Sequence, residues 1–307
     1  MSTYMEFTAY GDSAETVLEQ ASDSIQEWEK LWSTTDEDSE IYQINHSGGQ
    51  PVPVSPETEE LLRFTLEMAA QTDGALDPTI YPLVNAWGFI GQEYRVPSEL
   101  EIQQLLSLTG YEEVGLDHHT VTLPEGMQLD LGAVGKGYTG ELLAGYFKEQ
   151  GITSALLGIG GNIQMVGARP DGTRWRLGIK NPFGEGNFGV LEAADPAVVT
   201  SGGYERYFTD EDGTTYWHIL DPDTGRPADS GLASVTIIAD SGSLCDALST
   251  AVFVMGLEKG CEYWRTHDGF DMLLMTQDGE IYLTEEIEND FTLEDAFSDK
   301  EIHVIKR

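Results

Sequence analysis

An apolar segment, residues 244–255, strongly limits how this chain can fold. Its hydrophobic side chains recur at intervals of three and four residues, which places them on one face of an α-helix. They are Leu244, Ala247, Leu248, Ala251, Val252 and Met255. Such a face is stable only against other apolar side chains, so the segment is predicted to be a helix that faces the core.

Three oxygen-bearing side chains interrupt this apolar helix. Asp246, Ser249 and Thr250 stand at positions i, i+3 and i+4, so they share one face and can converge. One carboxylate and two hydroxyls are hard oxygen ligands, which suit Mg²⁺. In the structural alternative, Asp246 caps the first turn and the two hydroxyls bond carbonyls of their own helix.

The net charge of the chain limits what it can bind. With 16 basic and 54 acidic residues among 307, the net charge is −38 and the isoelectric point is about 4.1. Such a surface repels phosphates, which argues against binding nucleic acids or anionic membranes over the general surface. An anionic ligand would need a metal ion or local hydrogen-bond donors.

The order of the predicted elements indicates the fold class. Helices are predicted at 13–32, 56–72 and 98–108, from the glycine-rich turn after 129 to about 150, and at 244–255 and 257–267. Strands are predicted at 4–10, 155–166, 233–239 and 271–276, as a pair within 112–123, and in pieces of 174–238. The segments 33–54 and 73–91 are predicted to be irregular. Strands and helices do not alternate regularly, which favours an α+β fold with mixed, largely antiparallel sheets and packed helices. Residues 1–307 are predicted to form a single domain, with two closely packed lobes as the alternative.

A glycine-rich turn at residues 129–138 is a second candidate site. A predicted strand end leads through this turn into a helix, and Lys136, one of only 16 basic residues, lies in the turn. Glycines let the backbone approach a ligand closely, and a helix N-terminus favours anions. The spacing matches neither a Walker A loop nor a dinucleotide-binding loop. The alternative is a structural turn with a solvated lysine.

Three further segments combine turn residues with polar or aromatic side chains. The Gly-Gly-Asn sequence at 160–162 predicts a bulge or a close backbone approach rather than a phosphate loop. His218 ends a strand before the turn at 221–225 and is either a general base, a phosphate contact or a structural residue. The irregular segment around Asp77, followed by a tryptophan and a phenylalanine, either packs a planar ligand or forms a buried loop.

Together these segments resemble the motifs of the ApbE family of FAD:protein FMN transferases. The order and spacing match along almost the whole chain. The matching segments are Met1-Ser2-Thr3, Ser33-Thr34-Thr35, 74–79 with 86–89, 130–137, 160–162, 218–225 and 246–250. Any one segment alone is a weak signal, but seven in order make a chance resemblance very improbable.

The resemblance implies both an architecture and a reaction. The architecture is an α+β fold related to the T-fold. In the reaction, FAD is bound with Mg²⁺ and the FMN phosphate moves to a threonine or serine hydroxyl of a target flavoprotein, such as the flavin-acceptor domain of a respiratory or reductase complex, with release of AMP. Family members are usually exported and often lipid-anchored, so an extracytoplasmic, membrane-anchored full-length form is expected, with a cytoplasmic location as the alternative.

The resemblance also implies roles for individual residues, by their positions in the motifs. The implied Mg²⁺ ligands are Asp246, Ser249, Thr250 and the carbonyl group of Ala133. The implied FAD contacts are Met1, Thr35, Ala75, Leu76, Asp77, Asp130, Lys136 and Leu220. The implied catalytic residues are His218, as the base for the attacking hydroxyl, and Asp246, which would hold the metal on the pyrophosphate.

Two positions depart from the family pattern. Ser2 stands in place of a glycine, and Thr35 stands in place of a frequent tyrosine that would offer the flavin or the adenine an aromatic platform. A weaker platform leaves open a second activity, the metal-dependent hydrolysis of FAD to FMN and AMP by a pyrophosphatase. Binding of FAD without catalysis is a further alternative.

Overall fold

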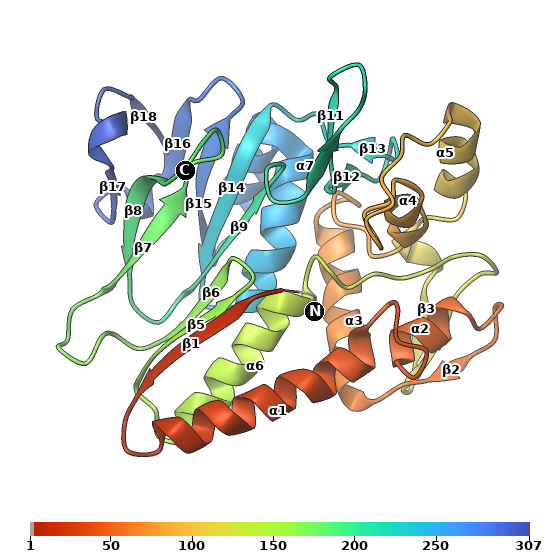
Figure 1. The fold of residues 1–307 in the computed structure, drawn as a ribbon, viewed down its shortest axis with the longest axis horizontal. Coiled ribbons are helices and arrows are strands. Elements are labelled where there is room, and N and C mark those ends of the chain that lie inside the picture. The colour runs from red at the N-terminus through yellow and green to blue at the C-terminus, as the bar shows by residue number, and fades with distance from the viewer. Residues whose placement is uncertain (1–2) are drawn as a thin grey trace. The chain divides into compact units, whose positions relative to one another are not determined.

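The computed structural model describes residues 3–307, in which helices are interspersed with largely antiparallel sheets (Figure 1). The helices are α1 (Ala14–Trp32), α2 (Glu40–Asn45), α3 (Pro56–Gln71), α4 (Tyr81–Ala86), α5 (Glu99–Leu106), α6 (Gly135–Glu149) and α7 (Gly242–Thr266). The predicted α+β class is confirmed.

The described chain divides into two units, and each is discontinuous in sequence. The first unit contains residues 24–135 and 205–229, and the second contains residues 3–23, 136–204 and 230–307. The chain passes from the first unit to the second within the first turn of α6, between Gly135 and Lys136. The single domain predicted over residues 1–307 stays a prediction.

Within the described residues, the second unit is built on an eight-stranded sheet. In spatial order its strands are β1 (Met5–Tyr10), β5 (Ser154–Ile159), β6 (Asn162–Val166), β9 (Ala197–Gly202), β14 (Leu232–Ala239), β15 (Phe270–Thr276), β16 (Ile281–Thr284) and β18 (Ile302–Ile305). Neighbouring strands are antiparallel, except that β16 and β18 run parallel. The acidic segment after residue 285 therefore contributes a strand to the edge of this sheet.

Both faces of the eight-stranded sheet are covered. On one face, a hydrophobic cluster that includes Ile238 and Leu273 packs against a smaller sheet of β7 (Trp175–Lys180), β8 (Asn187–Ala193) and β17 (Phe291–Leu293). The other face carries α6 and α7 (Figure 1), with α7 against β9 and β14. Side chains alternate between the two faces along each strand, so each strand contributes to both layers.

Helix α7 covers the predicted helix 244–255 and all but the last residue of the predicted helix 257–267. It begins at the N-cap Ser241, whose Oγ accepts the N–H of Leu244. Between the two segments Gly256 is non-helical, with φ 79° and ψ 178°, and a side chain there would lie 2.9 Å from the carbonyl oxygen of Ser230. Neither α7 nor any other helix among residues 3–307 combines the length and apolarity needed to cross a membrane.

The first unit carries most of the short elements. Its strands are β2 (Val52–Pro53), β4 (Thr120–Thr122) and β3 (Gly115–Asp117) in one sheet, the pair β10 (Tyr207–Thr209) and β11 (Thr215–Trp217), and the pair β12 (Leu220–Asp221) and β13 (Arg226–Pro227). Helix α3 begins as predicted, since Ser55 Oγ accepts the N–H of Thr58 and Pro56 follows the cap.

Three predictions about local structure were wrong. The segments 33–54 and 73–91 are not wholly irregular, because they contain α2 and α4; each of these helices has only six residues, too few to show a helical period. The predicted strand 155–166 is two strands, β5 and β6, joined at Gly160 and Gly161. Both glycines have positive φ, 56° and 93°, which permits a two-residue hairpin turn.

The negative charge predicts that stability depends on salt. Because 54 acidic residues share the chain with only 16 basic residues, self-repulsion destabilises the compact state relative to the expanded chain. Sodium chloride screens this repulsion, with a Debye length of about 10 Å at 0.1 M and about 3 Å at 1 M. We expect the urea midpoint of unfolding, followed by tryptophan fluorescence, to rise between these two concentrations. A midpoint that is unchanged or falls would contradict this.

Candidate functional site

The starts of α6 and α7 meet in the second unit at two glycines. A side-chain carbon on Gly137 would lie 2.1 Å from the carbonyl oxygen of Gly242, and one on Gly242 would lie 2.5 Å from the carbonyl oxygen of Gly137. No side chain fits at either position without moving backbone atoms, so only glycine permits this approach. The contact brings the first turn of α6 within hydrogen-bonding distance of Asp246 in α7.

The carboxylate of Asp246 is almost completely buried between the two helix starts. Asp246 is 2% exposed. Its Oδ2 accepts the N–H of Gly137 at 2.8 Å, and its Oδ1 lies 3.4 Å from Nζ of Lys136, whose side chain is 28% exposed. Asp246 therefore caps α6 rather than its own helix. At the N-terminus of α6 the helix dipole favours its negative charge.

The two hydroxyls predicted beside Asp246 have different surroundings. Ser249 Oγ is fully buried and donates to the carbonyl oxygen of Asp246 at 2.9 Å, which is the bond expected from the structural alternative. It also lies 2.9 Å from Oγ of Ser201 in β9, which donates to it because the Ser249 proton is already used. Thr250 is partly exposed, next along the same helix face.

A second attachment joins α6 to the start of α7. Oε2 of Glu141 accepts hydrogen bonds from Oγ of Ser241 at 2.8 Å and from the N–H and Oγ of Ser243 at 3.2 and 2.6 Å. All three donors come from the two residues that flank Gly242. Together with the contact between the two glycines, this carboxylate fixes the first turn of α7 and so the position of Asp246.

In the first unit, the loop at residues 74–79 is held by the side chain of Asp77. Its Oδ1 accepts the N–H and Oγ1 of Thr79 at 2.8 and 2.6 Å, and its Oδ2 accepts the N–H of Tyr111 at 3.2 Å. Asp77 is 9% exposed, and burial raises its pKa above the ordinary value although these hydrogen bonds oppose the shift. In the same loop Leu76 is buried and Ala75 is partly exposed.

The raised pKa of Asp77 predicts a pH effect on stability. Between the unfolded pKa and the higher folded pKa, the folded state binds more protons, so this contribution to stability is full at low pH and is lost as the pH rises. An Asp77→Asn variant has no such titration. We therefore expect its unfolding free energy, measured with urea, to rise relative to the wild type from about pH 4 to about pH 7. A difference that is independent of pH would refute the assignment.

Asp130 lies next to this loop in the first unit. Its N–H donates to the carbonyl oxygen of Pro78 at 2.8 Å, and its Oδ1 accepts the N–H of Gly132 at 2.9 Å. Ala133 follows and is partly exposed. Thr35 is exposed, and its hydroxyl lies 3.3 Å from Oγ of Ser33 within a local turn.

His218 and Leu220 lie close together at the β11 and β12 hairpins. Nδ1 of His218 lies 3.2 Å from the carbonyl oxygen of Arg206. Because a carbonyl only accepts, this contact favours the tautomer with the proton on Nδ1 and the lone pair on Nε2. The imidazole packs edge-on to the ring of Phe89 at 6.3 Å, and the side chain of Leu220 is buried in the cluster that contains Phe89.

The predicted site residues are divided between the two units. Lys136, Asp246, Ser249 and Thr250 belong to the second unit. Those in the first unit are Thr35, Ala75, Leu76, Asp77, Asp130, Ala133, His218 and Leu220. Met1 lies outside the described residues. The structure brings together Lys136 and Asp246, and also Asp130 and the loop of Asp77; the ligand roles of all these residues stay predictions.

Two features of the site were not predicted from the sequence. Glu141 and Ser201 contact the segment around Asp246, but a glutamate in a helix and a serine in a strand have no distinctive pattern. Among residues 3–307, no cluster of three or more histidine, cysteine, aspartate or glutamate side chains could hold a metal ion. A metal at Asp246 would therefore need hydroxyl, carbonyl, water or phosphate oxygens as further ligands.

Comparisons with known proteins agree with the family that the sequence motifs indicate. A model of the ApbE family matches residues 1–274. A Klebsiella pneumoniae protein named FAD:protein FMN transferase is 36% identical over 268 residues, which cover 85% of this chain and 82% of that protein. The structure of an ApbE protein from Thermotoga maritima is similar, with a TM-score of 0.86 and 34% identity over 92% of this chain and 94% of that chain. The structure of the flavin transferase ApbE from Vibrio cholerae has a TM-score of 0.85 and 30% identity, over 94% of this chain and 96% of that chain.

Proposed function

The chain belongs to the ApbE family, and on this premise we propose that it transfers the FMN part of FAD to a threonine or serine hydroxyl of a target flavoprotein. The reaction would depend on Mg²⁺ and release AMP. The observation that carries the proposal is the buried carboxylate of Asp246 beside Lys136, at the point where the starts of α6 and α7 meet. In a chain of net charge −38, this site places the ammonium of Lys136 beside N–H groups at the start of a helix, and both favour an anionic ligand.

The proposed reaction requires little covalent chemistry from the protein. The acceptor oxygen forms a bond to the phosphorus on the FMN side of the FAD pyrophosphate, and the bond from that phosphorus to the bridging oxygen breaks, so that AMP leaves. Phosphoryl transfer depends mainly on positioning and on neutralising charge. Lys136 and the first turn of α6 would stabilise the negative charge of the pyrophosphate.

The proton of the attacking hydroxyl needs an acceptor, and His218 is the proposed base. Its Nδ1 faces the carbonyl oxygen of Arg206, so the lone pair lies on Nε2, which is the atom that would take the proton. The same carbonyl would hold the ring in place after protonation, because Nδ1 keeps its proton throughout.

The residues around Asp246 fit Mg²⁺. In proteins this ion is held by one or two carboxylates, keeps several waters and takes phosphate oxygens of the substrate. Asp246 offers a carboxylate, Ser249 keeps one lone pair beyond its two hydrogen bonds, and Thr250 is partly exposed beside them. When bound, the ion would neutralise charge on the transferring phosphoryl group.

The test is to incubate the protein with FAD, Mg²⁺ and a flavin-acceptor domain, and to measure the intact mass of the acceptor together with AMP. The proposal expects the mass of the acceptor to increase by that of FMN less one water, with one AMP per transfer, and expects EDTA to stop both. Free FMN and AMP with an unmodified acceptor would indicate a pyrophosphatase instead. Bound FAD without AMP would indicate a binding protein without catalysis.

A further inference from the structure

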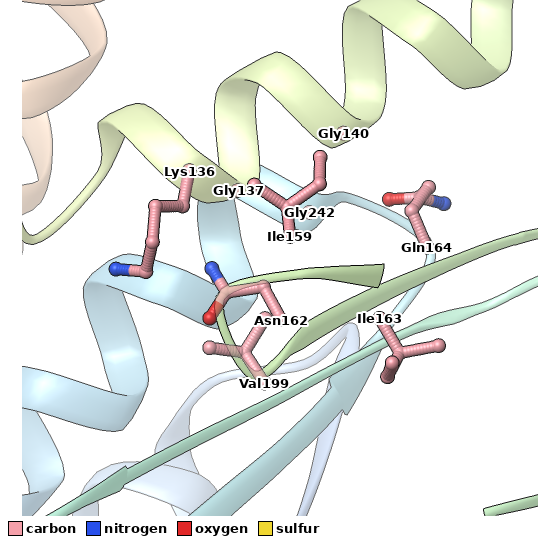
Figure 2. A pocket seen from close by; sticks show the side chains of 9 residues that line it. All are labelled: Lys136, Gly137, Gly140, Ile159, Asn162, Ile163, Gln164, Val199 and Gly242. Carbon is pink, nitrogen blue, oxygen red and sulfur yellow. The ribbon is translucent and has the colours of Figure 1, made fainter. Parts of the chain in front are cut away.

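A small pocket lies beside the first turn of α6 and contains two buried carboxamides with unmet hydrogen bonds. The pocket is lined by Lys136, Gly137, Gly140, Ile159, Asn162, Ile163, Gln164, Val199 and Gly242 (Figure 2). Asn162 and Gln164 are each 5% exposed. Within the described residues, Nδ2 of Asn162 and Oε1 of Gln164 have no hydrogen-bond partner. Leaving a buried polar atom without a partner is unfavourable, so a ligand that supplied the bond would be favoured.

The hairpin between β5 and β6 places Asn162 in this pocket. Gly160 and Gly161 form the turn, and Asn162 pairs with Ile159 as the first residue of β6. Asn162 and Gln164 are two positions apart, so both point to the sheet face that carries α6 and α7. The turn is closely packed, since a side-chain carbon on Gly160 would lie 2.1 Å from Oγ1 of Thr3. The strand pairing and the packed turn therefore fix the backbone position of Asn162.

We propose that Nδ2 of Asn162 and Nζ of Lys136 together form a subsite for one phosphate group of FAD. The inference rests on the proposed function and extends it to a residue that the motifs left without a role. Both side chains line the same pocket, and Figure 2 shows the ammonium of Lys136 and the carboxamide of Asn162 toward the same end of it. An unpaired N–H donor, a cation and the N-terminus of a 15-residue helix all favour an anion.

Gln164 is in the same pocket but is not part of this subsite. Its unpaired atom is Oε1, an acceptor, which would repel a phosphate oxygen. Oε1 of Gln164 lies against the start of α7, since a side-chain carbon on Gly242 would be 2.7 Å from this oxygen. Figure 2 shows the side chain of Gln164 at the other end of the pocket from Lys136 and Asn162. Because it has the same burial and the same strand face, Gln164 offers a matched control for Asn162.

The experiment measures binding rather than turnover. The dissociation constants of FAD and of riboflavin, which has no phosphate, are measured by quenching of flavin fluorescence in EDTA without an acceptor protein. Removing a donor to a charged group costs about 1.5–3 kcal/mol, so we expect Asn162→Ala to weaken FAD binding by at least about 10-fold. Asn162→Asp, which replaces the donor by a negative charge, is expected to weaken it by at least about 100-fold. Riboflavin binding should be unchanged, and Gln164→Met should leave FAD binding within about 3-fold of the wild type.

The outcomes separate this subsite from the proposed function. If the wild type binds FAD and the Asn162 variants bind it equally well, the subsite is wrong and the proposed function stands. If the variants weaken riboflavin as much as FAD, or if Gln164→Met has the same effect as Asn162→Ala, the pocket was disturbed generally and the subsite is also wrong. If the wild type binds FAD neither in EDTA nor with Mg²⁺, the proposed function fails and the subsite fails with it. If it binds FAD only with Mg²⁺, the same comparison of variants is made in Mg²⁺ and decides the subsite by the same outcomes. Urea unfolding of each variant identifies any that does not fold, and Asn162→Asp, which keeps the shape of the side chain, then provides the test.

Discussion

An Asp246→Asn variant is expected to lose at least about 100-fold in the rate of flavin transfer while it keeps its fold. Asparagine has nearly the same shape, and its side-chain oxygen can still accept the N–H of Gly137 that caps α6 at 2.8 Å. It cannot provide the negative charge that pairs with Lys136 and that would bind Mg²⁺. The substitution therefore separates the structural role of this carboxylate from its proposed role in metal binding.

The measurement compares AMP release and the mass of the flavinylated acceptor over a range of Mg²⁺ concentrations. Asp240→Asn is the matched control, because Asp240 is an exposed aspartate just before α7 and should keep the wild-type rate. Urea unfolding checks that both variants fold. A wild-type rate for Asp246→Asn at saturating Mg²⁺ would show that this carboxylate is not a metal ligand.

Gly137→Ala is expected to destabilise the protein by about 3 kcal/mol. The added carbon would lie 2.1 Å from the carbonyl oxygen of Gly242 and 2.7 Å from Cβ of Asp246. The first of these atoms belongs to the backbone, so relief of the clash requires the starts of the two helices to separate. Separation would also lengthen the hydrogen bond from the N–H of residue 137 to Asp246, and we expect FAD binding to weaken in the same variant.

Gly145→Ala provides the control on the same helix. Gly145 is exposed in α6, and an added carbon there would have no atom within 4 Å. Alanine is favoured over glycine in a helix, so this variant should be more stable than the wild type by about 0.5–1 kcal/mol. Unfolding free energies from urea titrations test both variants. Equal effects of the two substitutions would contradict the contact between the helix starts.

The long elements could be predicted because their patterns are local. The apolar period of residues 244–255 matches the first part of α7, and the interruption of that helix falls at Gly256, between the two predicted segments. Helix α3 starts at residue 56, as predicted, with Ser55 as its cap. The hairpin at 160–161 was missed because apolar residues on both sides of it read as one continuous strand, and only the positive φ angles of the two glycines reveal the turn.

The candidate site could be predicted only in part. The positions of Asp246, Ser249 and Thr250 on one helix face follow from their spacing. The capping of α6 by Asp246 does not follow, because the sequence indicated only a cap on its own helix. Asn162 was recognised as part of a motif, but its unpaired donor is visible only once the pocket around it is formed.

The sequence by itself determined the fold class, the family and the residue types that the proposed site needs. These follow from periodicity, charge and motif order, which can be read along the chain without knowing which residues meet in space. Only the tertiary structure decided which groups meet: Gly137 and Asp246 are 109 residues apart and come into contact because two glycines let the starts of α6 and α7 approach. A contact of this kind depends on the packing of whole elements, and no local pattern encodes it.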